Sequence, residues 1–80
     1  MCLTMTHKTR TYEELETIGI PYDVPELGIR AGDMGTIATV YAEGRMLDVE
    51  VIREDGQTIG FVDLEVQDTG GLRLVGHSAA

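Results

Sequence analysis

Residues 46–64, MLDVEVIREDGQTIGFVDL, decide the fold because they read as one antiparallel hairpin. Residues 47–51 alternate between apolar and polar side chains, which indicates a strand with one buried face and one solvated face. The pair Asp55-Gly56 that follows is typical of a tight hairpin turn, and a second apolar run comes after it. The two faces of the first strand are Leu47, Val49 and Val51 on one side and Asp48, Glu50 and Ile52 on the other.

Runs of β-branched residues separated by turn residues continue on both sides of this hairpin. They predict five short strands, of which the second, third and fourth form an antiparallel meander. Ile37 and Val40 are three residues apart in the second run, which indicates a bulge or strong coiling of the kind that closes small barrels. The expected fold is all-β, a five-stranded SH3-like small barrel. Its expected core is Ile18, Ile20, Leu27, Ile37, Val40, Leu47, Val49, Val51, Phe61, Leu64 and either Leu72 or Leu74.

The ends of the chain differ from this region in composition. Residues 1–16 form an N-terminal extension in which residues 6–16 are either a short helix capped by Thr11 or disordered. The barrel domain is expected over residues 17–75. Residues 76–80 are expected to be a frayed tail.

Composition limits the kinds of partner and the setting. The 80 residues carry 14 acidic and 6 basic side chains, a formal net charge of −8, so the mean field repels nucleic-acid phosphates and anionic lipids. The single cysteine, Cys2, has no partner for an intrachain disulfide, which favours a cytoplasmic protein. Neither a signal peptide nor a membrane span is evident. A basic protein is the expected partner.

Residues 28–37, GIRAGDMGTI, connect the first two expected strands and contain three glycines. A phosphate cradle would need a helix start and a Gly-Lys-Ser/Thr sequence after the glycines, and neither is present. The glycines suit a turning chain instead, and the Asp33 carboxylate can accept hydrogen bonds from local amides. We therefore interpret the segment as a structural turn motif, consisting of Pro25, Gly28, Gly32, Asp33 and Gly35.

Gly28, Gly32, Gly35 and Ile37 together resemble the KOW motif of ribosomal and transcription-factor barrels. This resemblance implies an SH3-like fold. KOW domains that hold RNA usually surround these glycines with lysines, whereas here only Arg30 is basic. A KOW-type nucleic-acid-binding domain is thus one alternative function, disfavoured by the charge.

A closer resemblance covers residues 17–75. The run DVPELGIRAGDMGTIATVY is similar to a family of small bacterial domains of unknown function with the motif D-(L/V)-P-E-x-G-(L/I)-x-x-G-D-x-G-T-V. The resemblance implies an SH3-like barrel and no established activity or catalytic residues. The matching residues are Asp23, Val24, Pro25, Glu26, Leu27, Gly28, Ile29, Gly32, Asp33, Gly35, Thr36, Ile37, Val40 and Tyr41.

The sequence offers few residues for catalysis or metal binding. His7 and His77 both fall in terminal segments, where a general base would lack fixed geometry. Cys2 and His7 would supply two ligands where structural zinc takes four. The chain is therefore expected not to be an enzyme, with no catalytic residue, no metal and no cofactor.

A small acidic protein-binding module is the function that remains. SH3-like barrels bind partners between the first long loop and the hairpin of strands three and four, and we place Tyr22 on that face. Asp48 and Glu50 would form an acidic outer wall for the basic partner. The alternative role is an antitoxin-like or immunity-like regulatory subunit that masks a basic partner. An uncovered barrel edge would also allow a homodimer.

Overall fold

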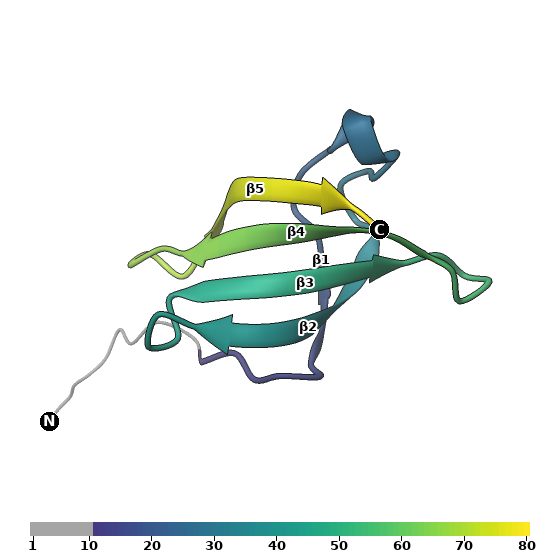
Figure 1. The fold of residues 1–80 in the computed structure, drawn as a ribbon. Coiled ribbons are helices and arrows are strands. Elements are labelled where there is room, and N and C mark those ends of the chain that lie inside the picture. The colour runs from purple at the N-terminus through teal and green to yellow at the C-terminus, as the bar shows by residue number, and fades with distance from the viewer. Residues whose placement is uncertain (1–10) are drawn as a thin grey trace, which may run out of the picture.

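A computed structural model describes residues 11–80, and these residues form five strands and one short 3-10 helix. The elements are β1 (Thr17–Gly19), the 3-10 helix η1 (Pro25–Leu27), β2 (Met34–Tyr41), β3 (Met46–Ile52), β4 (Thr58–Val66) and β5 (Leu72–Ala79). The strands pair antiparallel in chain order, as Figure 1 shows. The predicted all-β class and the five strands are confirmed.

The sheet is an open meander, because the pairing runs from β1 to β5 and no described strand pair joins those two strands. β1 crosses behind the other strands in Figure 1, and the long connection from β1 to β2 rises past β5 before it returns. Closure into an SH3-like barrel stays a prediction. The register between β2 and β3 shifts between Ile37 and Thr39, where the spacing of apolar residues indicated a bulge.

The segment before β1 is not a helix where it is described. Leu15 lies in a turn with a φ of 73°. Its N–H donates to the Ile37 carbonyl at 2.8 Å, and the Ile37 N–H donates to the Glu16 carbonyl at 2.9 Å. These bonds extend the β1–β2 ladder toward the N-terminus. They use the Leu15 N–H and the Glu16 carbonyl, which in a helix would bond within the helix itself. The helical alternative is therefore wrong for residues 11–16, and residues 6–10 lie outside the described residues.

β5 continues to Ala79, so it includes residues that the sequence assigned to a C-terminal tail. Gly60, Phe61 and Val62 of β4 pair with Ala79, Ser78 and His77. The small side chains gave no strand signal in the sequence. Backbone pairing with β4 nevertheless holds them in the sheet.

The core lies on one face of the sheet, which we call the inner face. Its residues are almost entirely buried, and no buried polar side chain accompanies them within residues 11–80. Most of the expected core is present, although Leu27, Val40, Leu72 and Leu74 are only partly buried. Val24, Ile29, Val62 and Val66 were not expected. The buried set is Ile18, Ile20, Val24, Ile29, Ile37, Leu47, Val49, Val51, Val62, Leu64 and Val66.

Phe61 was predicted to be in the core, and this prediction was wrong. In β4 the buried positions are Gly60, Val62, Leu64 and Val66, so Phe61 points to the opposite face and is half-buried there. The side-chain period of two in a strand forbids Phe61 and Leu64 from sharing a face without a bulge in β4.

One cross-strand row of the inner face is built mostly from small residues. Its members, Ile18, Gly35, Val51, Gly60 and Ala79, are paired in succession across all five strands. A Cβ at Gly35 would lie 2.6 Å from Val49 Cγ1, and a Cβ at Gly60 would lie 2.8 Å from Leu27 Cδ1. The two glycines therefore leave space that neighbouring side chains fill.

Replacing Gly35 by Val should destabilise the fold. The added Cβ would meet Val49 Cγ1 and would also lie 3.1 Å from the Glu50 carbonyl oxygen, so the strands would have to separate. Overpacking of this kind costs about 1–3 kcal/mol. Gly19→Val is the matched control, because nothing lies within 4 Å of a Cβ there. Thermal unfolding should show a lower melting temperature for Gly35→Val alone; equal melting temperatures would contradict the contact.

Val49→Ala should cost about 2–3 kcal/mol, since Val49 is fully buried and its loss leaves a cavity beside Gly35. Val75→Ala makes the same chemical change at a position that is 44% exposed, and should change stability by about 0.5 kcal/mol or less. Urea titrations of the two variants measure the difference. Similar midpoints would place Val49 outside the core.

Candidate functional site

The structural turn motif lies in the connection between β1 and β2, where side chains and backbone bond to one another. Gly28 and Gly32 have φ values of 74° and 98°, a region that costs other residues about 1 kcal/mol or more. The Gly28 N–H donates to the Pro25 carbonyl at 3.1 Å and ends η1. The Arg30 N–H donates to Asp33 Oδ2 at 2.9 Å. The segment has the geometry of a turn held by local bonds.

Two further contacts fix this connection to the core. Val24 and Ile29 form an isolated bridge with two backbone hydrogen bonds of 2.8 and 3.1 Å, and both side chains are buried. The Ala31 N–H donates to Asp23 Oδ1 at 2.8 Å. The carboxylates of Asp23 and Asp33 therefore bond to backbone amides of their own loop.

Tyr22 was predicted to bind a partner from the loop face. Its side chain is partly buried against the core, and its hydroxyl donates to the Leu72 carbonyl at 2.6 Å. This bond joins the β1–β2 connection to the start of β5. The structure places Tyr22 apart from Asp48 and Glu50, which lie on β3.

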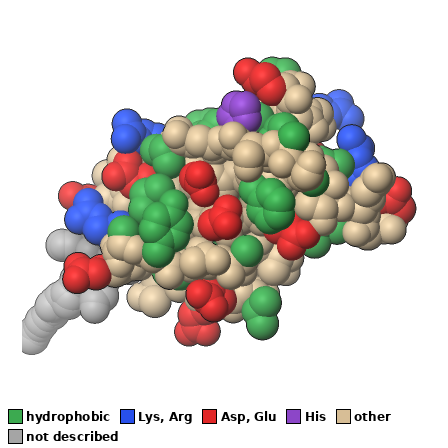
Figure 2. Space-filling view, in the orientation of Figure 1, with side chains coloured by type: hydrophobic (Ala, Val, Ile, Leu, Met, Phe, Trp, Pro, Cys, Tyr) green, Lys and Arg blue, Asp and Glu red, His purple; other side chains and the backbone are tan. Residues whose placement is uncertain are grey.

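Asp48 and Glu50 lie on the face opposite the core, which we call the outer face. Cross-strand pairing brings two more acids beside them from β4, because Asp48 is opposite Asp63 and Met46 is opposite Glu65. Figure 2 shows acidic side chains gathered over the middle strands between larger hydrophobic groups, with basic side chains toward the periphery. We define the acidic face as Tyr41, Asp48, Glu50, Phe61, Asp63 and Glu65.

The centre of the acidic face is the pair Asp48–Asp63. Partial burial, the negative charge of Asp63 and a hydrogen bond with it together raise the pKa of Asp48 above its ordinary value. Like charges directly opposite each other across two strands destabilise a sheet. The fold therefore holds two carboxylates together at a cost that a bound cation would remove.

Aromatic side chains flank this pair. Tyr41 is 43% exposed, and partial burial followed by the charges of Asp63 and Asp48 raises the pKa of its hydroxyl. Phe61 is opposite Glu50, whose carboxylate accepts a hydrogen bond from the Thr58 hydroxyl. Negative charge beside aromatic rings is an arrangement that attracts lysine and arginine side chains.

Glu65 differs from the other acids because it has a basic neighbour. Its Oε1 lies 2.9 Å from Arg73 Nη2 and 3.1 Å from Gln67 Nε2. The hydrogen bonds from Gln67 and then Arg73 lower the pKa of Glu65. Glu65 thus marks the edge of the acidic face, where negative charge is already neutralised.

A shallow hollow of about 690 Å³ lies between the β1–β2 connection and the β3–β4 hairpin. SH3-like barrels were expected to bind partners at this place. Its apolar part includes Met34 and Ile52, which are 50% and 36% exposed. No aromatic residue lines it. The lining residues are Gly32, Asp33, Met34, Val51, Ile52, Arg53, Glu54, Asp55 and Ile59.

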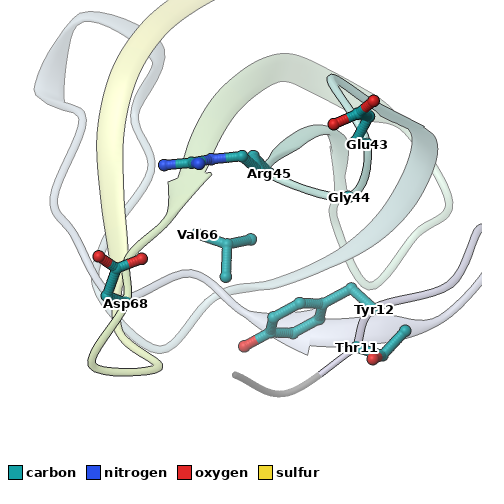
Figure 3. A pocket seen from close by; sticks show the side chains of 7 residues that line it. All are labelled: Thr11, Tyr12, Glu43, Gly44, Arg45, Val66 and Asp68. Carbon is teal, nitrogen blue, oxygen red and sulfur yellow. The ribbon is translucent and has the colours of Figure 1, made fainter. Parts of the chain in front are cut away.

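A second hollow of about 300 Å³ lies where the turns before β3 and after β4 meet the N-terminal segment. Figure 3 shows the Tyr12 ring extending toward Val66, with Arg45 and Asp68 around the opening. Glu43 also lines it. This mixture of charges selects neither cations nor anions.

Within residues 11–80, no group of three or more His, Cys, Asp or Glu residues is arranged to hold a metal ion. His77 is exposed on β5, whereas Cys2 and His7 lie outside the described residues. No helix in this part of the chain is long and apolar enough to cross a membrane.

Four members of the acidic face were not predicted as site residues: Tyr41, Phe61, Asp63 and Glu65. Asp63 is the most consequential of them, because it lies opposite Asp48. The signal was present, because alternation from Val62 through Leu64 to Val66 places Asp63 on the outer face. Placing both Phe61 and Leu64 in the core gave β4 no consistent pair of faces. Asp63 was therefore not assigned to the outer face.

A family model described as "Domain of unknown function (DUF4926)" matches residues 14–68, which is more than half of the chain. The chain belongs to this family. The expected membership in a small domain family of unknown function is confirmed. Searches of curated proteins and of solved structures gave no match. The description of this family assigns no activity to it.

Asp63→Asn should stabilise the protein at neutral pH. Because the pKa of Asp48 is raised on folding, the folded chain holds this proton more tightly, and the free energy of unfolding falls as pH rises through the interval between the unfolded and folded pKa values. Without the Asp63 charge the pKa of Asp48 is raised less, so the free energy of unfolding falls less as pH rises. We expect a gain of about 0.2–1 kcal/mol at pH 7, in the range of cross-strand pairs, and little gain at pH 3.

Thermal unfolding of wild type and variant at several pH values measures this gain. Asp68→Asn removes the same charge from the exposed turn after β4 and serves as the control. Glu65 changes the pH dependence of stability in the opposite direction, because its pKa is lowered on folding. Glu65 is present in the wild type and in both variants, so its contribution cancels in the comparison. An equal gain from Asp68→Asn would show that only net charge matters.

Proposed function

We propose that this domain is a non-catalytic protein-binding module whose acidic face docks on a basic protein surface. The observation that carries the proposal is the Asp48–Asp63 pair, with Glu50 beside it on the same face. A docked lysine or arginine would relieve the repulsion between the two carboxylates and keep both ionised. Part of the binding free energy would thus come from relief of the repulsion between Asp48 and Asp63 in the free domain.

Two features of the surroundings suit such a contact. Tyr41 and the half-buried Phe61 offer apolar area next to the charges, and aromatic residues commonly anchor protein interfaces. A folded sheet also presents these side chains without ordering a loop first, which lowers the entropic cost of association.

We infer in addition that the open sheet and its long β1–β2 connection belong to an SH3-like small barrel. The meander order, the bulge in β2 and the packing of Leu27 over Gly60 support this assignment. We also infer a cytoplasmic bacterial setting from the single cysteine and the resemblance of residues 17–75. An experimental structure with a closed β1–β5 contact would support the barrel, and a flat sheet would contradict it.

A narrower role is that of a regulatory subunit, antitoxin-like or immunity-like, that covers a basic active site. The net charge of −8 and the acidic face favour it over a KOW-type nucleic-acid-binding domain. Affinity capture of a partner from the source cells, followed by its identification, distinguishes the regulatory role from the KOW-type role. A basic nuclease inhibited by the domain supports the regulatory role, whereas tight binding to duplex DNA or RNA at physiological salt would support the KOW-type role.

Reversing Asp48 and Glu50 to Lys together should weaken binding to the captured partner by tenfold or more, about 1.4 kcal/mol. Binding by the wild type should also weaken between 0.1 M and 1 M salt, where the Debye length falls from about 10 Å to about 3 Å. Isothermal titration at both salt concentrations measures these effects.

The matched control reverses Glu13 and Glu26 to Lys, because both are exposed and neither lies on the acidic face. This control makes the same change in net charge and should retain most of the affinity. Equal weakening by the two double variants, or binding that ignores salt, would contradict docking at the acidic face.

A further inference from the structure

The turn before β1 carries a leucine where the backbone favours glycine. The Glu16 N–H donates to the Glu13 carbonyl at 3.2 Å, so residues 13–16 form a turn in which Leu15 occupies the third position. The φ of Leu15 is 73°. Turns with a positive φ at this position usually have glycine or asparagine there, because the Cβ of other residues crowds the following carbonyl oxygen. The leucine therefore lowers the stability of this turn.

Packing of the Leu15 side chain does not offset this loss. The side chain is 81% exposed, more than any other large hydrophobic side chain in residues 11–80, and it does not pack against the core. A single exposed leucine is ordinary on a protein surface. An exposed leucine in a strained backbone is different, because neither the turn nor the core gains from it. Strained positions of this kind concentrate at sites that bind other molecules.

β2 holds Leu15 in this conformation. The Leu15 N–H donates to the Ile37 carbonyl at 2.8 Å, and the Ile37 N–H donates to the Glu16 carbonyl at 2.9 Å. Figure 1 shows this segment, in purple, passing beside β2. The side chain is therefore presented on a backbone that is already ordered, which lowers the entropic cost of inserting it into a partner.

The turn adjoins the acidic face. Glu14 is exposed, and its Oε2 accepts the N–H of Val40, the residue before Tyr41, at 3.4 Å. The Leu15 backbone bonds to β2 and β2 pairs with β3, so two strand spacings, about 10 Å, separate Leu15 from β3. An interface of ordinary size buries about 800 Å² of each partner, which is enough to include both.

We propose that Leu15 is an apolar anchor that inserts into a pocket on the basic protein bound by the acidic face, with basic side chains of that protein at the pocket rim near Glu14. This inference rests on the proposed function, because both contacts involve the same partner. Burying the leucine removes apolar area from water and adds to the electrostatic contact. A second copy of this chain fits the place poorly, because it would bring a net charge of −8 to a surface that is itself acidic.

Leu15→Gly tests the proposal, because it should change stability and binding in opposite directions. Glycine adopts a φ of 73° without strain, so the melting temperature should rise by up to about 4–8 °C. Loss of the side chain should weaken binding about tenfold or more. Affinity capture with the wild-type domain supplies the basic partner, and isothermal titration with that purified partner measures the binding.

Ala42→Gly is the matched control. Ala42 also has a positive φ, 53°, and is exposed, so this change relieves similar backbone strain and removes only a methyl group. It should raise the melting temperature and leave the affinity for the partner unchanged. Leu15→Met keeps a long apolar side chain and should retain most of the affinity.

The double reversal of Asp48 and Glu50 to Lys separates this inference from the proposed function. If the reversal weakens binding and Leu15→Gly does not, the acidic face is the docking site and Leu15 is not an anchor. If Leu15→Gly alone weakens binding, the anchor is supported and docking at the acidic face is contradicted. If neither change weakens binding, or if no basic protein is captured, both proposals are wrong.

Two further results would overturn the inference. A lower melting temperature for Leu15→Gly would show that the leucine supports the fold. Sedimentation velocity gives the other result, because a wild-type dimer that Leu15→Gly dissociates would assign the side chain to contact with a second copy.

Discussion

The close approach of β2 and β3 at Gly35 is the constraint on which the rest of the sheet depends. Val49 Cγ1 occupies the place where a side chain at position 35 would begin, and Ile20 Cδ1 lies 3.4 Å from the same point. Gly60 plays the equivalent role in β4, where Leu27 fills the space. Residues 20 and 27 both belong to the β1–β2 connection. Because the two glycines in this cross-strand row have no side chains, the long β1–β2 connection can pack on the inner face as part of the core.

The same arrangement determines what the outer face can present. With the apolar side chains directed inward and the register of β3 against β4 fixed, Asp48 has to lie opposite Asp63. A shift by one residue would expose Leu64 and bury the carboxylates, at a cost far above the repulsion that the native register accepts. The acidic pair is a consequence of core packing, and this makes its geometry rigid.

How much could be predicted depended on whether a residue lay in a periodic segment. The alternation of residues 46–52 predicted β3 and its two faces correctly, and the spacing of Ile37 and Val40 indicated the bulge. Val24 and Ile29 escaped prediction because they meet through a loop bridge that has no periodicity. Phe61 and Leu64 were both placed inside although a strand without a bulge cannot direct residues three apart to one face, and Asp63 was not identified. Tyr22 was identified as important, but its hydrogen bond to Leu72 spans 50 residues and left no local pattern.

The bond between Tyr22 and Leu72 bears on where the folding unit ends. The family model stops at residue 68, before β5 begins, yet β5 supplies the acceptor for this hydroxyl and the pairing partner for β4. A fragment cut at residue 68 would turn β4 into a nine-residue edge strand and would leave Val62, Leu64 and Val66 less covered. The segment that the family model matches is therefore shorter than the paired sheet of this chain, and expression boundaries should include β5.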